Sequence, residues 1–80
     1  RGPLSEAASR AEKRVEKLSE ERRRAHTELA DPALYQKSGE AVVAVQKRVA
    51  ELDRALGEAE AAWLAAQEAL EQAKGETEPA

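Results

Sequence analysis

The sequence predicts an all-α protein that folds as an antiparallel two-helix coiled-coil hairpin. Ala, Glu, Lys, Leu and Arg dominate its 80 residues, which is typical of long helices. Of the 33 hydrophobic residues, 18 are alanine, so too few bulky side chains remain for a layered core. Apolar residues recur at alternating spacings of three and four in two segments that a short connection joins.

Residues 1–4 are expected to be a lead-in. The string Gly-Pro-Leu-Ser over residues 2–5 has the form of the scar left by a cleaved expression tag. We therefore begin the hairpin at about residue 5 and extend it to residue 74.

The first helix is predicted over about residues 5–30. Ser9 and Glu12 have the spacing of a capping box, and Ser5 is the alternative for an earlier start. The helix should end near Ala30, because Pro32 disfavours helical backbone at Asp31. Its heptad series contains one charged member: Leu4, Ala8, Ala11, Val15, Leu18, Arg22, Ala25 and Leu29.

The second helix is predicted over about residues 39–74, after a connection at about 31–38. Ser38 is the expected N-cap and Gly75 the expected C-cap, with a flexible tail over 75–80. Its heptad series is unbroken and implies a left-handed supercoil: Val42, Val45, Val49, Leu52, Leu56, Ala59, Trp63, Ala66, Leu70 and Ala73.

The short connection predicts antiparallel helices. We choose the register in which facing residue numbers add up to 74, because it places Ala11 against Trp63 and Val15 against Ala59, small against large. In the connection, Leu34 and Tyr35 are expected to plug the closed end of the hairpin. Arg22, at a core position, either lays its stem along Leu52 with the guanidinium in solvent, or forms a polar layer that fixes the register.

Several kinds of chemistry are missing from the sequence. It has no cysteine, no glycine-rich phosphate loop and one histidine, His26, without a second metal ligand at helical spacing. Adjacent carboxylates such as Glu20 and Glu21 point to different sides of a slender rod that offers no pocket. We expect no enzymatic activity, catalytic residue, metal or cofactor in this chain. No apolar run of about 20 residues and no signal peptide is visible, and we expect a cytoplasmic location.

The net charge of −3 conceals an asymmetry, because residues 1–30 carry +2 and residues 31–80 carry −5. Arg10, Lys17 and Arg24 share one heptad position and form a basic stripe. This stripe is either a face that contacts nucleic-acid phosphates or a solvated surface with intrahelical ion pairs. The candidate nucleic-acid-binding residues are Arg10, Arg14, Lys17, Arg22, Arg23, Arg24, Lys37, Lys47 and Arg48.

Trp63 and Leu64 have alternative interpretations. Trp63 fits the core opposite Ala11 better than a ligand site. Leu64, at a position off the core, is a candidate for a strip that contacts another protein, together with the alanines Ala55, Ala62 and Ala69.

The string Leu29-Ala30-Asp31-Pro32-Ala33-Leu34-Tyr35, followed by a heptad helix and then Trp63, resembles the C-terminal domain of ABC-F ATPases, with the Uup-like subgroup the most similar. The resemblance covers about residues 8–73. It implies an antiparallel two-helix coiled coil that follows tandem nucleotide-binding domains. ATP and Mg belong to those domains in the parent protein, and none of their catalytic residues maps onto this chain.

The resemblance also implies a function. Uup-like C-terminal domains are associated with DNA binding, the whole proteins with branched DNA and with limiting transposon excision, and the wider family with the ribosome. We therefore expect a monomeric, auxiliary DNA-binding domain that contacts backbone phosphates and no membrane. The alternatives are a contact arm for ribosomal RNA, and a spacer or protein-interaction rod that positions the ATPase domains.

Overall fold

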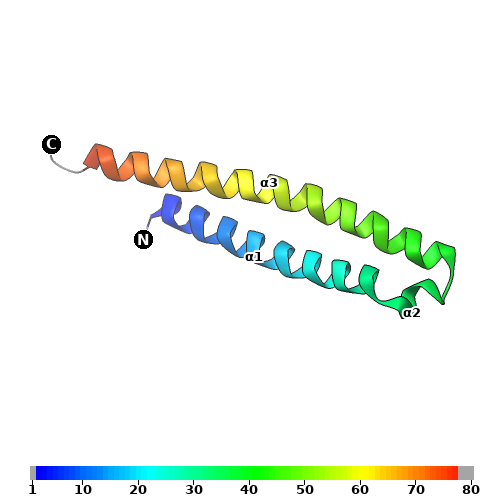
Figure 1. The fold of residues 1–80 in the computed structure, drawn as a ribbon. Helices are drawn as coiled ribbons and strands as arrows, with labels where there is room; N and C mark the ends of the chain where they lie inside the picture. Colours follow the sequence, from blue (N-terminus) through cyan, green and yellow to red (C-terminus); the bar gives the residue numbers. More distant parts are fainter. Residues whose placement is uncertain (1, 78–80) are drawn as a thin grey trace.

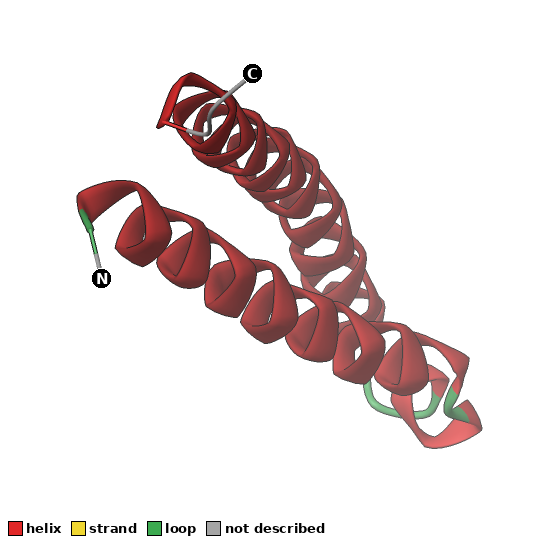
Figure 2. Cartoon of the chain, turned by 90° about the vertical axis from the view of Figure 1, so that its left-hand side faces the viewer, coloured by secondary structure: helices red, strands yellow, loops and turns green. Residues whose placement is uncertain are grey.

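The computed structural model describes residues 2–77, with Thr77 described through its backbone alone, and it confirms the all-α hairpin. Helix α1 (Pro3–Ala30) and helix α3 (Gly39–Thr77) run antiparallel along their length, and the short helix α2 (Pro32–Tyr35) lies between them at the closed end (Figure 1). The start of α1 and the end of α3 both lie at the opposite, open end of the hairpin (Figure 1 and Figure 2). The result is a rod of 64 × 17 × 16 Å.

The heptad series of both helices form the seam of the hairpin. Every predicted seam residue is buried or half-buried, apart from Leu4 near the open end, which is 40% exposed. The apolar side chains of the two heptad series are therefore removed from water together, and this burial is the main favourable contribution to the fold. The most deeply buried residues of the two series are Ala8, Ala25, Val45, Leu52 and Ala59.

The observed contacts between the helices fit the predicted register. Arg22 Nε donates to Asp53 Oδ1 across the seam, next to the expected partner Leu52. At the open end, Leu4 and Leu70 line one shallow groove of about 520 Å³. A shift by one heptad would move each of these pairs about 10 Å apart along the axis, because a helix rises 1.5 Å per residue.

The connection contains a helical turn that the sequence analysis did not predict. Asp31 caps α2 by accepting a hydrogen bond from the Ala33 amide at 2.9 Å, and Pro32 occupies the first helical position, where its missing N–H costs nothing. Leu34 is 3% exposed and plugs the closed end as expected. The next helix begins as predicted, since Ser38 Oγ accepts from the Ala41 amide at 3.1 Å.

The prediction that Tyr35 also plugs the closed end is wrong. Its side chain is 57% exposed, and its hydroxyl donates a hydrogen bond of 2.6 Å to the Leu29 carbonyl. That carbonyl lies in the last turn of α1, where carbonyls have no partner within the helix. Tyr35 therefore ties α2 to the end of α1 from the surface, because its polar tip needs an acceptor that the core does not offer.

Both outer helix boundaries differ from the predicted ones. Helix α1 begins at Pro3 with Gly2 as N-cap, so neither Ser5 nor Ser9 caps it, since proline is already preorganised for the first helical turn. Helix α3 passes through Gly75 and ends at Thr77, with no glycine at positive φ among the described residues. The predicted C-cap at Gly75 is wrong, and the part of the predicted tail over 78–80 lies outside the described residues.

Candidate nucleic-acid interface

The nine predicted contact residues all reach the surface, but their surroundings differ. Eight of them are exposed, and Arg22 is half-buried at the seam. Six lie on α1, Lys37 lies in the connection, and Lys47 and Arg48 lie near the start of α3. The structure therefore divides them into three groups: the Arg22–Arg24 cluster, the closed-end cations and the basic row of α1.

The Arg22–Arg24 cluster is engaged in ion pairs. Arg23 holds Glu20 with two hydrogen bonds, from Nη2 to Oε1 at 2.7 Å and from Nε to Oε2 at 3.0 Å. Arg24 Nε donates to the same Oε1 at 3.3 Å. One carboxylate one turn away thus binds two guanidinium groups, a spacing at which helical side chains meet. Arg23 and Arg24 are therefore less available to bind a ligand phosphate than the sequence suggests.

Arg22 forms a polar layer at the seam. Its guanidinium bonds Asp53 of α3, and His26 Nε2 lies 4.0 Å from the same Asp53 oxygen. The stem remains at the core position while the charged end reaches the flank, so both interpretations of Arg22 describe part of the geometry. Because the pair joins the two helices, it favours this register over a shifted one. We assign Arg22 a role in pairing the helices.

The Glu20 carboxylate provides a direct test of the Arg23 and Arg24 contacts. The hydrogen bond from Arg23, supplemented by the charge of Arg23 and by Arg24, lowers the pKa of Glu20 from 4.5 to about 2. A lowered folded-state pKa stabilises the fold above the unfolded value of 4.5, and this contribution is lost as the pH falls from 4.5 towards 2. We expect an NMR titration midpoint near pH 2 for Glu20, and a clear rise towards 4.5 in Arg23→Gln. A Glu20 midpoint near 4.5 in the unmodified chain would show that the hydrogen bonds from Arg23 and Arg24 do not persist in solution.

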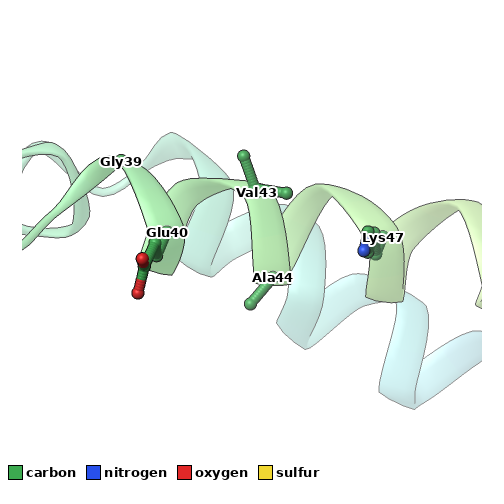
Figure 3. A pocket seen from close by; sticks show the side chains of 5 residues that line it. All are labelled: Gly39, Glu40, Val43, Ala44 and Lys47. Atoms are coloured by element: carbon green, nitrogen blue, oxygen red, sulfur yellow. The ribbon is translucent and has the colours of Figure 1, made fainter.

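The closed-end cations are spread over the surface. Lys37, Lys47 and Arg48 form no ion pair within the described residues. Lys47 borders a depression of about 450 Å³ together with Val43 and Ala44 (Figure 3). All five residues that line this depression belong to the first turns of α3, so no second element walls it. It is a shallow helix surface and lacks the concavity of a ligand pocket.

The basic row of α1 consists of Arg10, Lys13, Arg14 and Lys17, and Lys13 was not among the predicted contact residues. Arg10, Lys13, Arg14 and Lys17 stand at i, i+3, i+4 and i+7, and all four are exposed. No ion pair involves any of them in the described part of the chain, although Glu12 and Glu16 lie in the same segment. Lys13 could have been found from this spacing, since the pattern defines one helix face.

The proposed strip of Leu64 with Ala55, Ala62 and Ala69 is not continuous. Leu64 is 55% exposed on the outer side of α3, whereas Ala55 and Ala69 are half-buried. Around a helix with 100° per residue, the three alanines lie about 140–180° away from Leu64. The two features therefore belong to different flanks of the rod.

No helix within residues 2–77 has the length and apolarity needed to cross a membrane. The same residues contain no group of three or more His, Cys, Asp or Glu side chains that could hold a metal ion.

Comparison with known proteins gives one match. No curated protein and no solved structure matches the chain significantly. The family model of the ABC transporter C-terminal domain matches residues 6–68, which takes in most of α1, all of α2 and α3 up to the turn after Trp63. Since this match covers more than three quarters of the chain, the protein belongs to the ABC transporter C-terminal domain family.

Proposed function

We propose that this chain is an auxiliary nucleic-acid-binding arm of an ABC-F type ATPase, in the Uup-like subgroup, and that it acts in the cytoplasm. The family supports an accessory domain of an ABC protein. The observation that supports nucleic-acid binding is the basic row of α1, whose cations are exposed and form no ion pair in the described residues. DNA is the preferred ligand.

The shape of the molecule favours a contact with backbone phosphates. A rod about 17 Å wide presents its cations along one helix, and the two depressions on its described surface are too shallow to enclose a base. Of the two aromatic residues, Tyr35 lies in the connection, and Trp63 lies at the seam, on a different side of α1 from the basic row, so neither offers a stacking platform there. Phosphate contacts position a protein on nucleic acid without reading its sequence, so the expected binding is weak and independent of sequence.

Binding of the 80-residue chain to a plain DNA duplex, a branched DNA and a structured RNA tests this function. Three phosphate contacts correspond to a slope of about −2.7 in log K against log salt, or about a 40-fold loss of affinity between roughly 50 and 200 mM salt. Replacing Arg10 and Lys17 by glutamate should abolish measurable binding, while Leu64→Ala should leave it unchanged. If the unmodified chain, with full helicity, binds none of the three ligands at low salt, the function proposed here is wrong.

The competing function is a spacer or docking rod for the ATPase domains. Its supporting observation is the outer face of α3, where Val43 and Leu64 are both about half exposed. Charge reversal on α1 should spare such a role, whereas replacing Leu64 should impair it. A structured RNA that competes better than either DNA would favour the ribosomal-RNA contact instead.

A further inference from the structure

We infer that the nucleic-acid contact is made by a four-cation patch on the outer side of α1, formed by Arg10, Lys13, Arg14 and Lys17, and that the closed-end cations do not take part. This inference rests on the proposed function and assigns its site and ligand class, the phosphate backbone of a double helix. The arrangement of the charges in residues 10–17 and the ion pairs of the Arg22–Arg24 cluster support it. The closed-end cations are also without an ion pair in the described residues, but they do not share one helix face, since Lys37 lies outside α3 and Lys47 and Arg48 are about 100° apart on it.

The eight residues of this segment separate their charges by side. At 100° per residue, the four cations occupy an arc of about 100°, and both acids of the segment lie outside this arc, Glu12 about 150° and Glu16 about 110° from its centre. The seam residues Ala11 and Val15 occupy the side that faces α3. The segment therefore carries a concentrated positive face that points away from the partner helix.

Within residues 10–17 this arrangement is mostly unfavourable for the helix, because Lys13–Glu16 is the one opposite-charge pair at i,i+3 or i,i+4. Arg10–Arg14 and Lys13–Lys17 are like-charge pairs at i,i+4, and Arg10–Lys13 and Arg14–Lys17 are like-charge pairs at i,i+3. Such pairs destabilise a helix, whereas opposite charges at the same spacings would stabilise it. A segment that needed only solubility would interleave the signs. The clustering of like charge thus favours a polyanionic ligand that neutralises it.

Further along α1, the arginines already have carboxylate partners within the fold. One heptad further on, Arg23 and Arg24 share Glu20, and Arg22 bonds Asp53. A ligand phosphate would have to displace these carboxylates, whereas in the four-cation patch it meets side chains without an ion pair in the described residues. The nearest acids along the same face are Glu6 on one side and Glu21 on the other, so the patch has defined ends.

The patch also fits the ligand in size. Arg10 and Lys17 are seven residues apart, or about 10.5 Å along the helix axis. A DNA strand advances about 3.4 Å per phosphate along the duplex axis. The patch therefore spans about three phosphate steps of one strand, and its long arginine and lysine side chains can reach the phosphates. A small anion would engage only part of it.

Two charge-matched variants test the inference by fluorescence anisotropy with a labelled DNA duplex at several salt concentrations. The patch variant is R10Q/K13Q/R14Q/K17Q. The matched variant is K37Q/K47Q/R48Q/R54Q, which removes the same number of charges at and beyond the closed end. Glutamine has a helix propensity close to that of arginine and lysine, so both variants should keep their helicity by circular dichroism.

We expect the patch variant to lose at least tenfold in affinity and about three units of the salt slope, and the matched variant to stay within about threefold of the unmodified chain. The melting temperature of the patch variant should stay close to that of the unmodified chain, because relief of the repulsion among the four cations offsets the loss of their opposite-charge neighbours Glu6, Glu16 and Glu21. Equal losses in both variants would overturn the patch and leave nucleic-acid binding in place. Absence of binding by the unmodified chain would overturn the proposed function itself. Poly-glutamate that binds as tightly as the duplex would overturn the assignment to a phosphate backbone.

Discussion

Leu34→Ala should destabilise the hairpin by about 2–5 kcal/mol, the usual cost of truncating a buried leucine. Leu34 is 3% exposed and is the buried residue of α2, between the ends of the two long helices. Because α2 is only one turn long, the alanine variant leaves a cavity that few neighbours can fill. A loss of this size is a large part of the stability of a small domain, so the variant should be partly unfolded at room temperature.

Leu64→Ala is the matched control for this prediction. It makes the same chemical change at a position that is 55% exposed, on the outer side of α3, where the alanine also favours the helix. We expect a change within about 0.5 kcal/mol. Urea unfolding followed by circular dichroism at 222 nm measures both variants. If the two cost the same, Leu34 does not act as a plug and the closed end is held by the capping hydrogen bonds alone.

Trp63→Ala should cost about 3–5 kcal/mol, the range for losing a large aromatic side chain from a core. Trp63 is half-buried at the seam, and the register places Ala11 across from it. The facing residue is thus too small to fill the space that the indole leaves. The effect should appear as a loss of helicity over the open half of the rod, where the other seam residues are mostly alanines.

A second substitution, Trp63→Phe, tests the contribution of the indole N–H separately from that of the aromatic ring. Nε1 is buried and has no hydrogen-bond partner, which costs about 1–3 kcal/mol relative to a satisfied donor. Phenylalanine removes that donor and gives up part of the ring contact, two effects of opposite sign. We expect its unfolding free energy to lie within about 1.5 kcal/mol of the unmodified chain. A cost as large as that of Trp63→Ala would mean that the N–H has a partner in solution.

Much of the fold could be predicted because its information is local. A heptad repeat is a property of neighbouring residues, and it identified both long helices and the seam, while the short connection predicted the antiparallel pairing. Ser38 could be assigned as a cap for the same reason, since a cap involves residues only three positions apart. Leu34 was found by elimination, as an apolar residue in a short connection with no other place to go.

The helix ends were harder to predict because several weak local preferences compete there. Ser5 and Ser9 are good N-caps, yet the backbone set by Pro3 begins the helix first. Gly75 is a typical helix stop, but its preference amounts to about 1 kcal/mol and the helix continues past it. Tyr35 was misplaced because its hydrophobic ring suggested burial, whereas its hydroxyl required the Leu29 carbonyl.

By itself, the sequence determined that this protein is a two-helix coiled-coil hairpin with a basic first helix, because heptad spacing and charge are local properties of the sequence. Only the tertiary structure decided which of those charges are already paired. Glu20 holds Arg23 and Arg24, and Asp53 of the partner helix holds Arg22. An ion pair depends on which side chains come within about 4 Å, and that distance is set by rotamers and by the neighbouring helix. Counting charges could therefore locate a basic helix and the spacing of its four cations, whereas only the folded hairpin showed that these four form no ion pair within the described residues.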